Sequence, residues 1–215
     1  GGGVLRIGSG VARAERAGEG WRLTLEDGST LSAATVVNAA GAWADTVAQV
    51  FGAAPVGLVP MRRSAFTFDA GAGHDSTACP ALVAIDESWY IKPGHGQLLG
   101  SPANADPTTP HDVVPEEIDI ATGIWRIEEA TTLTIRRPTS TWAGLRSFVP
   151  DGELVIGFDD AVSGFFWLAG QGGYGIQSAA GASALADALL RDAPLPEALR
   201  QHGVDPAAST PARLR

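Results

Sequence analysis

A glycine-rich turn near the carboxyl end most limits the folds open to this chain. An apolar run at residues 164–170 (GFFWLAG) leads into residues 170–175 (GQGGYG), and residues 175–190 (GIQSAAGASALADALL) have the composition of a helix. The run lacks polar alternation, which is typical of a strand buried on both faces. These segments predict a strand, a tight glycine turn and a helix, the repeating unit of α/β folds.

The turn matches the pattern G-x-G-x-x-G, but a dinucleotide site needs more than the glycines. It needs a βαβ unit and an acidic residue about 20 positions later. The expected helix runs to about Arg191, and the following DAPLPEALRQHG contains no second apolar strand. Three uses remain open: pyrophosphate binding, close packing without a ligand, and approach of a flat, electron-rich ring. The free N–H groups of a helix start favour negative charge.

A second segment, residues 36–45 (VVNAAGAWAD), predicts the same unit. Val36 and Val37 form a short buried strand, residues 38–41 a turn, and residues 42–51 a helix that ends at Gly52. Two such units, one near each end, predict one α/β domain built from both ends of the chain. The middle of the chain is then inserted between them.

The middle, roughly residues 57–141, predicts a mostly antiparallel sheet with one helix. Strands are expected at 57–69, 81–88, 89–93 and 96–102, separated by Gly, Pro, Asp and Asn. The helix is expected at 115–130, with Pro115 in its first turn and one apolar face. That face is expected to comprise Ile118, Ala121, Ile124 and Trp125.

The flanking segments complete the expected architecture. Strands are predicted at 10–16 and 21–28, and in the second Trp21, Leu23 and Leu25 alternate with polar residues as in a half-buried strand. Residues 133–150 read as extended and 151–158 as a hairpin arm. The Pro- and Ala-rich tail after Asp192 is expected to be loosely ordered.

Composition narrows the classes of partner. The net charge of −9 argues against nucleic acid, because Lys and Arg supply most of that affinity. One cysteine, Cys79, excludes an internal disulfide and argues against a cysteine-based zinc site, so no metal is predicted. No apolar run reaches the ~18 residues of a membrane span. The start lacks Met and a signal peptide, so we expect the chain to begin within a longer protein or after processing.

Several motifs resemble one known family. VVNAAGAWAD, MRRSAFTF, DESWYIKP, LLGSPANADP, EEIDIATGIWRIEEATTLTIRRP, WAGLRSFVPDG and GFFWLAGQGGYGIQSAAG are similar to the second half of FAD-dependent amine oxidoreductases of the D-amino-acid oxidase and sarcosine oxidase type. The similarity runs from about Val11 to the tail and is greatest to the bacterial D-arginine dehydrogenases. It implies a two-domain flavoprotein whose N-terminal FAD-binding half lies outside this sequence, in the same or another chain.

On this resemblance the α/β (α+β) fold divides into named parts. Residues 1–56 and 144–198 belong to a Rossmann-like FAD-binding domain, 57–143 form the substrate domain, and 199–215 are a tail. The implied activity is oxidative deamination of D-amino acids, with basic substrates such as D-arginine favoured, in the bacterial cytoplasm. A sarcosine- or glycine-oxidase-like enzyme and a non-catalytic domain that needs a partner chain for flavin are the alternatives. Nothing indicates a membrane or quinone acceptor.

The resemblance also assigns site residues. Arg63, Tyr90 and Arg146 are implied to be catalytic, and with Gly144 they are implied to bind substrate. Without the resemblance, Arg63 would be interpreted as a surface charge and Tyr90 as an aromatic residue of the sheet. Because side chains alternate along a strand, only one of Arg62 and Arg63 can face a pocket, and the resemblance selects Arg63. The implied FAD contacts are Val11, Ala12, Ala40, Gly41, Arg146, Gly172, Gly173, Tyr174, Gly175, Ile176 and Gln177.

No general base stands out among the remaining titratable residues. The acidic pairs Asp159–Asp160 and Glu128–Glu129 are expected to be solvated. The histidines are expected to be solvated as well, and they are His74, His95, His111 and His202.

Overall fold

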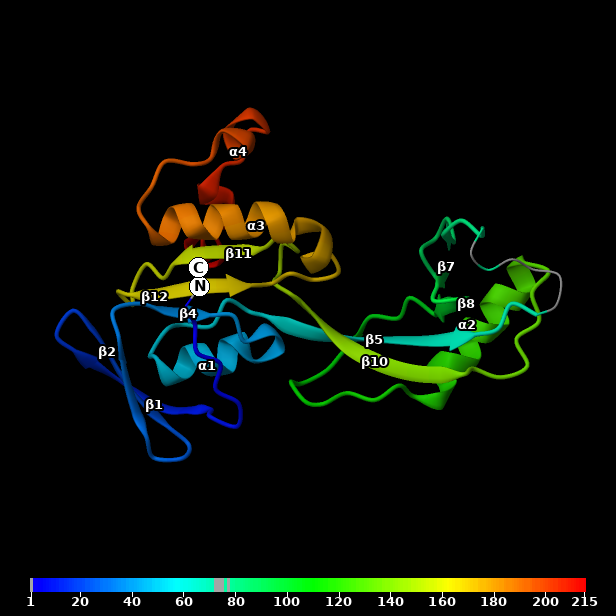
Figure 1. Cartoon of the computed structure of the whole chain (residues 1–215), viewed down its shortest axis with the longest axis horizontal. Helices are drawn as coiled ribbons and strands as arrows, with labels where there is room; N and C mark the ends of the chain where they lie inside the picture. Colours follow the sequence, from blue (N-terminus) through cyan, green and yellow to red (C-terminus); the bar gives the residue numbers. More distant parts are fainter. Residues whose placement is uncertain (1, 72–75, 77) are drawn as a thin grey trace. The chain divides into compact units, whose positions relative to one another are not determined.

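The computed structural model describes residues 2–71, 76 and 78–215, and the chain divides into two compact units. Unit 1 comprises Gly1–Val59 and Ser147–Arg215, and unit 2 comprises Pro60–Arg146. Both combine sheets with helices, which confirms the predicted mixed α/β class (Figure 1).

The central sheet of unit 1 joins strands from distant parts of the sequence. Its order is β11 (Val155–Phe158), β12 (Phe165–Ala169) and β4 (Val36–Asn38). Strand β12 runs antiparallel to β11 and parallel to β4. Helices α3 (Gly175–Leu190) and α1 (Ala44–Val50) lie on opposite sides of this sheet (Figure 1). Both ends of the chain therefore contribute to one layered structure, as the two strand–turn–helix segments predict. The prediction that Val36 and Val37 are buried is wrong for Val37, which is 42% exposed, and the buried residue of β4 is Asn38.

Strand β12 is buried on both faces, which confirms its prediction. Phe165 and Trp167 pack in a cluster that includes residues of α1, whereas Phe166 packs in a second cluster with Leu185 and Ala186 of α3. Alternate side chains of a strand point to opposite faces. An uninterrupted apolar run is therefore what a strand between two helices requires.

A second, antiparallel sheet of unit 1 comprises β1 (Val11–Ala17), β2 (Gly20–Leu25) and β3 (Thr30–Ala33). Alternate residues of β2 are buried, and these are Trp21, Leu23 and Leu25. The period-two pattern in the sequence is thus confirmed.

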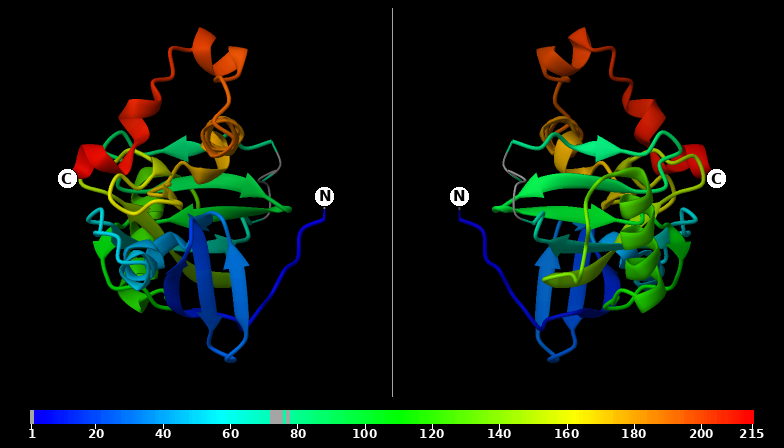
Figure 2. Two further views of the ribbon diagram at one scale, coloured as in Figure 1. Left: turned by 90° about the vertical axis from the view of Figure 1, so that its left-hand side faces the viewer. Right: turned by 90° about the vertical axis from the view of Figure 1, so that its right-hand side faces the viewer.

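The C-terminal tail is structured, so the prediction that it is loosely ordered is wrong. It forms α4 (Glu197–Gln201) and the 3-10 turns η2 (Pro206–Ser209) and η3 (Pro211–Leu214), coloured orange-red to red in Figure 2. Pro211 is buried, and the last residue, Arg215, donates to Asp159 and to the carbonyl of Ala54. Contacts with residues far back in the sequence order this segment, and its own composition gives little sign of them.

Asp159 is buried, so the prediction that it is solvated is also wrong. Its Oδ1 accepts from the amides of Ala161 and Val162 at 3.0 and 2.9 Å. Its Oδ2 accepts from Trp167 Nε1 at 2.9 Å and from Arg215 Nη2 at 2.6 Å. Asp160, in contrast, is half exposed at its side chain.

Unit 2 is built on an antiparallel sheet of order β10-β5-β8-β7-β6, with β9 paired to β5. The strands are β5 (Val59–Phe68), β6 (Leu82–Val83), β7 (Tyr90–Gly94), β8 (Gln97–Ser101), β9 (Asp106–Pro107) and β10 (Ser140–Phe148). Strands β5, β6 and β8 lie within segments that the sequence predicts as extended, and β7 extends one residue beyond its predicted segment, to Gly94.

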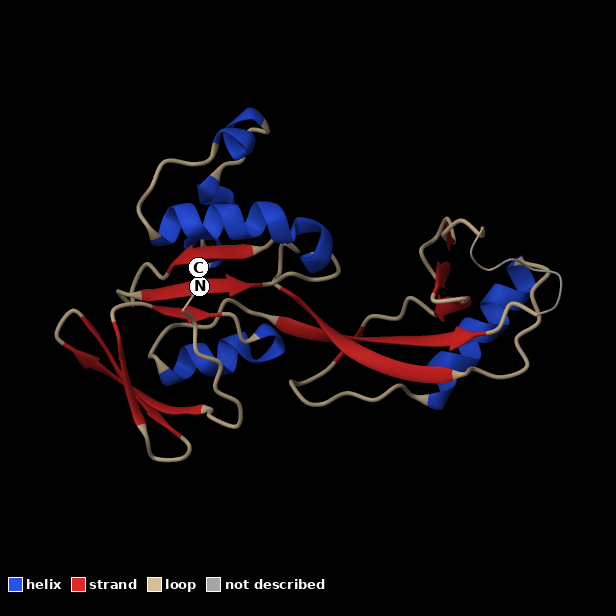
Figure 3. Ribbon diagram, in the orientation of Figure 1, coloured by secondary structure: helices blue, strands red, loops and turns tan. Residues whose placement is uncertain are grey.

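Helix α2 (Glu117–Ala130) lies along this sheet (Figure 3), but it buries a different face from the predicted one. Gly123 and Ile127 are buried, and Ile124, which the prediction did include, packs against the same core. Ile118 and Trp125 are 66% and 61% exposed. The helix also begins after Pro115, because Glu116 is its extended N-cap residue.

Close approach of the helix to the sheet at Gly123 explains why α2 buries this face and not the predicted one. A Cβ at this position would lie 2.9 Å from Phe66 Cε1 and 3.0 Å from the backbone nitrogen of Pro102. Only a glycine lets the helix come this close to the sheet.

The acid Glu128 is expected to be solvated, but its Oε1 accepts a hydrogen bond from the amide of Ile135 at 2.6 Å.

Candidate functional site

One face of the unit 2 sheet is covered and the other carries polar side chains. On the covered face, Phe66, Phe68, Ile91 and Leu98 pack with Ile127 of α2. Residues at odd positions of β5 and at even positions of β7 alternate with that set. Strand register places Lys92 of β7 opposite Leu99 of β8. Strand periodicity therefore directs one set of side chains to the face opposite α2.

A cavity of about 400 Å³ lies on this open face. Its lining residues come from four strands, and they are Arg63, Ala65, Tyr90, Lys92, Leu99, Trp142, Gly144, Leu145 and Arg146. The structure thus brings Arg63, Tyr90, Gly144 and Arg146 into one cavity. Their roles in binding and catalysis stay predictions.

Among the described lining residues three are cations and none is an acid. Within the described part of the chain, Arg63, Lys92 and Arg146 form no ion pair, whereas the neighbouring Arg62 is paired. Arg62 lies 3.2 Å from Asp119 through its Nε and 3.4 Å from Asp106, and it also pairs with Glu116. Arg63 and Arg146 are therefore left to bind an anion from outside the chain.

Burial is the main influence on Arg63. Loss of solvent lowers the pKa of Arg63 below its usual value, and the positive charge of Arg146 lowers it further, while Tyr90 and Glu87 act in the opposite direction. The guanidinium still stays protonated at neutral pH. Its buried Nε has no hydrogen-bond partner among the described residues. A bound carboxylate would relieve the repulsion between the two guanidinium groups and satisfy such donors.

Sequence reasoning missed five of the lining residues, which are Ala65, Lys92, Leu99, Trp142 and Leu145. A signal was available for three of them, and for Ala65 it is its position two residues after Arg63. Lys92 stands two positions after Tyr90, and Trp142 stands two and four positions before Gly144 and Arg146. The period of two would have placed them on the same face, but Leu99 requires the cross-strand register.

The two small-residue turns of unit 1 lie at one edge of its central sheet. Strands β4 and β12 are parallel neighbours, so the turns that follow them leave the sheet on the same side. The first turn is closed by Asn38, whose Nδ2 donates to the carbonyl of Ala44 at 2.9 Å and whose Oδ1 accepts from Ala40 at 3.3 Å. Carboxyl ends of neighbouring parallel strands are where α/β folds bind ligands.

The glycines of the second turn adopt conformations that suit close approach. Gly170 and Gly172 have φ values of +73° and +52°. A Cβ at Gly172 would lie 2.5 Å from Phe148 Cε1, so a side chain has no room there. The amide of Gly172 donates to the carbonyl of Ser147 at 2.9 Å, which fixes the turn. The predicted Gly173 follows in the same exposed turn.

The start of helix α3 is open to a ligand. No side chain of the described residues caps it, and its first turn holds no acidic residue. Tyr174 and Ile176 are 57% and 96% exposed. Uncapped N–H groups and the positive end of the helix dipole fit an electron-rich, anionic group such as the edge of a reduced flavin ring. The residues present therefore fit part of a flavin, with Gly175 and Gln177 in the same helical turn.

Of the remaining predicted cofactor residues, Arg146 belongs to unit 2 and the other four belong to unit 1. Gly41 has a φ of +56° in the first turn, next to Ala40. Val11 packs against the hydrophobic cluster of unit 1, and Ala12 is exposed on β1. Contact of these residues with FAD stays a prediction.

Other classes of site leave little trace in the described residues. His95, His111 and His202 are exposed, as predicted, and His74 lies outside the described residues. The described part of the chain groups no three His, Cys, Asp or Glu side chains that could hold a metal ion. Within it, no helix has the length and hydropathy needed to cross a membrane.

Comparison with known families identifies the family of this chain. Residues 1–188 match the family described as FAD dependent oxidoreductase (DAO). The match covers well over half of the chain, so the chain belongs to this family. FAD is the cofactor of the family.

Solved structures share the fold. Glycine oxidase from Geobacillus kaustophilus is 21% identical with a TM-score of 0.69, over 86% of this chain and 49% of its own. L-proline dehydrogenase from P. horikoshii is 19% identical with a TM-score of 0.71, over 91% and 54%. L-amino acid deaminase from Proteus vulgaris is 13% identical with a TM-score of 0.75, over 95% and 57%. The chain thus spans about half the length of these structures.

Proposed function

We propose that this chain forms the substrate-binding part of an FAD-dependent D-amino-acid dehydrogenase or oxidase. The observation that carries the proposal is the pair Arg63 and Arg146, which line one cavity whose described lining residues include no acid. Two guanidinium groups in one partly apolar cavity suit a carboxylate, the group common to all amino acids.

Each lining residue has a role in this proposal. Arg146 grips the substrate carboxylate through two parallel hydrogen bonds, and Arg63 and the Tyr90 hydroxyl complete the clamp. The backbone carbonyl of Gly144 accepts a hydrogen bond from the substrate amine. A clamp of this kind fixes Cα in one position, and alignment supplies much of an enzyme's rate. When bound, FAD supplies the acceptor for the two electrons removed from the amine.

FAD binding is shared between this chain and the rest of the fold. The exposed turn Gly172–Tyr174 and the first turn of α3, through Gln177, would lie against the flavin. Ala40 and Gly41, together with Val11 and Ala12, would contact other parts of FAD. Because the chain spans about half the length of its structural relatives, we propose that the activity requires the other half of that fold.

A preference for basic substrates such as D-arginine is part of the proposal. Glu87 lies in the loop before β7, and its negative charge acts to raise the pKa of the cavity residue Arg63. Glu87 adopts a φ of +57°, which is uncommon for residues other than glycine. An acid near a cavity of cations can pair with the cationic side chain of a basic amino acid while the arginines bind its carboxylate.

The substitution Arg146→Lys tests the proposal in the flavin-loaded enzyme that contains this chain. Lysine keeps the charge but loses the planar fork, so kcat/KM for D-arginine should fall by roughly 30- to 1,000-fold. Flavin content, read from visible absorption, should change little. The control Arg22→Lys alters an exposed arginine on β2 and should leave kcat/KM unchanged.

Substrate comparison separates this function from its neighbours. D-arginine should be oxidised faster than L-arginine, glycine and sarcosine, and Glu87→Gln should lower kcat/KM for D-arginine more than for D-alanine. Faster oxidation of glycine or sarcosine would favour an amine oxidase of the glycine-oxidase type. An unchanged kcat/KM in Arg146→Lys would make Arg146 a structural residue and contradict the proposal.

A further inference from the structure

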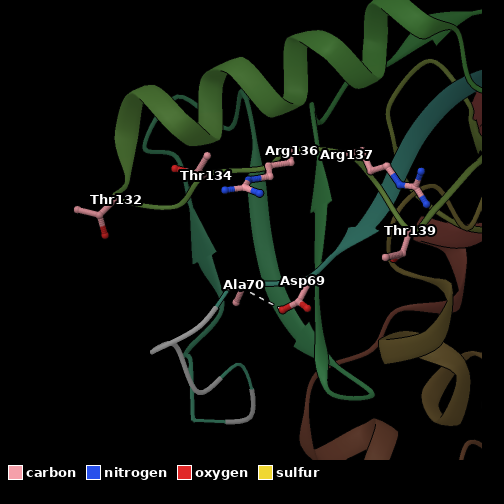
Figure 4. A pocket seen from close by; sticks show the side chains of 8 residues that line it. Asp69, Ala70, Thr132, Thr134, Arg136, Arg137 and Thr139 are labelled. Carbon is pink, nitrogen blue, oxygen red and sulfur yellow. Dashed lines mark hydrogen bonds between the residues drawn. The ribbon is translucent and has the colours of Figure 1, made fainter.

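A second cavity of unit 2, of about 670 Å³, shares no lining residue with the first (Figure 4). It lies among the end of β5, the residues that follow it and the segment between α2 and β10. Its lining residues are Asp69, Ala70, Gly71, Thr132, Thr134, Arg136, Arg137 and Thr139. The volume is in the range of small-molecule sites, ~300–1,000 Å³.

The segment that carries the arginines is fixed by hydrogen bonds. The amide of Leu133 donates to Thr131 Oγ1 at 3.2 Å, that of Ile135 to Glu128 Oε1 at 2.6 Å, and that of Thr139 to the carbonyl of Thr67 at 2.8 Å. These bonds anchor the segment at its start, middle and end. The cavity is therefore preformed, which lowers the entropic cost of binding.

Alternation along this segment separates an apolar from a polar side. Ile135 is buried and Leu133 packs against the unit 2 core. Thr132, Thr134 and Arg136 occupy the intervening positions and are exposed, and all three line the cavity. Figure 4 shows these side chains along one stretch of chain beneath α2. The polar wall thus follows from the requirement to bury the apolar residues.

The charges of this wall lack internal compensation. Six arginines of the described residues pair with acids, and several others, including Arg63 and Arg146, do not; the paired ones are Arg13, Arg62, Arg191, Arg200, Arg213 and Arg215. Arg136 and Arg137 form no ion pair within the described part of the chain, although the chain has 24 acidic residues. Among the described lining residues the one acid is Asp69, whose Oδ1 accepts from the amide of Gly71 at 3.0 Å. The guanidinium groups of these two consecutive residues therefore have no acidic partner among the described residues and are available to an anion.

We propose that this second cavity binds a small organic ligand through an oxyanion group, a carboxylate or a phosphate. Arg136 binds the oxyanion, and the hydroxyl of Thr134, two positions earlier on the same side of the segment, donates a further hydrogen bond to it. Arg137 extends in the opposite direction in Figure 4 and contributes positive charge to the cavity. Thr139 is already bonded to Gln97 and Thr67, so it contributes shape. Asp69 accepts a hydrogen bond from an amino or hydroxyl group on the same ligand and disfavours a second negative charge beside it.

Residue-resolved NMR titration of the 215-residue chain tests this proposal with two probes, inorganic phosphate and acetate. We expect saturable shifts of the amides of Thr132, Thr134, Arg136 and Arg137. The variant R136Q/R137Q should weaken the binding at these amides at least about tenfold, because the charge-assisted contact of Arg136 and the positive charge of Arg137 are both lost. Stronger binding of phosphate than of acetate identifies a phosphate ligand, and the reverse order a carboxylate.

The control variant R6Q/R22Q removes the same charge at two exposed arginines of unit 1 and should leave the shifts unchanged. If R136Q/R137Q does not fold, R136K/R137K keeps the charge and should weaken binding severalfold through loss of the guanidinium fork. An absence of saturable shifts in the wild type, or equal affinity in the arginine variants, would overturn the proposal. Shifts at Tyr90 and Gly144 report the first cavity separately.

Discussion

Replacement of Asp159 by asparagine should cost unit 1 a large part of its stability. The side chain of Asp159 is fully buried and its partner Arg215 is 18% exposed at the side chain. The asparagine would keep the shape and could still accept from Trp167 or from the amides of Ala161 and Val162, but the charge would be lost. Arg215 would then face a neutral group at the position where it now donates at 2.6 Å.

The size of the effect follows from these contacts. Removal of one partner of a buried pair costs about 3–5 kcal/mol, and a hydrogen bond to a charged group contributes about 1.5–3 kcal/mol. Arg215 retains Asp160 and the carbonyl of Ala54. We therefore expect a loss of about 2–3 kcal/mol in the free energy of unfolding. For a chain of this length that corresponds to a fall in Tm of roughly 4–12 °C.

Urea unfolding followed by tryptophan fluorescence, together with calorimetry, measures this loss. The matched control is Asp160→Asn, which removes the neighbouring carboxylate from the same arginine. Its side chain is half exposed, so the cost should stay below about 1 kcal/mol. Equal effects of the two substitutions would refute the reasoning, because burial of Asp159 would then make no difference.

Three further outcomes follow from other parts of the structure. Burial is the largest single influence on the pKa of Asp159 and raises it, but the hydrogen bonds from Arg215, Trp167 and two amides together outweigh burial and lower the pKa. The stabilisation is therefore present above the unfolded pKa of about 3.9 and is lost as pH falls through the folded pKa, so the stability gap between wild type and Asp159→Asn should shrink below about pH 4. Gly172→Ala should destabilise unit 1 by at least about 1–2 kcal/mol, since φ is +52° and Phe148 blocks the Cβ, whereas Gly181→Ala on α3 should be neutral or stabilising in thermal melts. In urea unfolding, Ile127→Ala should lower the free energy of unfolding by about 2–5 kcal/mol, and the exposed Ile118→Ala should lower it by less than about 0.5 kcal/mol. Similar losses for the two variants would contradict the burial of Ile127 and the exposure of Ile118.

Local patterns were sufficient for most elements of the fold. The alternation of Trp21, Leu23 and Leu25 predicts β2, because one face of that strand is buried. The apolar run at 164–170 predicts β12, because helices cover both sides. In each case the property that the sequence encodes is burial along a single element, which requires no knowledge of its partner.

Features set by distant residues escaped prediction. The rotation of α2 depends on the close approach of Gly123 to Phe66, which lies on another element far back in the sequence. The burial of Asp159 depends on Arg215, 56 positions away. A pair of acids or an apolar stripe in a single sequence does not show which distant residue will contact it.

The candidate site was predicted unevenly for the same reason. Arg63, Tyr90, Gly144 and Arg146 were assigned by resemblance, and strand periodicity explains why one face can hold them. Lys92 and Trp142 share that periodicity with Tyr90 and Arg146 and were within reach of it. Leu99 enters the cavity only through the pairing of β7 with β8, which the sequence does not state.

The parallel pairing of β4 with β12 sets an order of events for the growing chain. Val36 of β4 pairs with Phe165 of β12, so the central sheet of unit 1 cannot form until about 130 residues after β4 have been synthesised. Unit 2, in contrast, is one continuous segment and can fold while the chain is still being synthesised. During that interval β4 has an unpaired edge, a template for association with other chains. Rapid folding of the inserted segment would shorten this exposure by bringing the two flanking strands together.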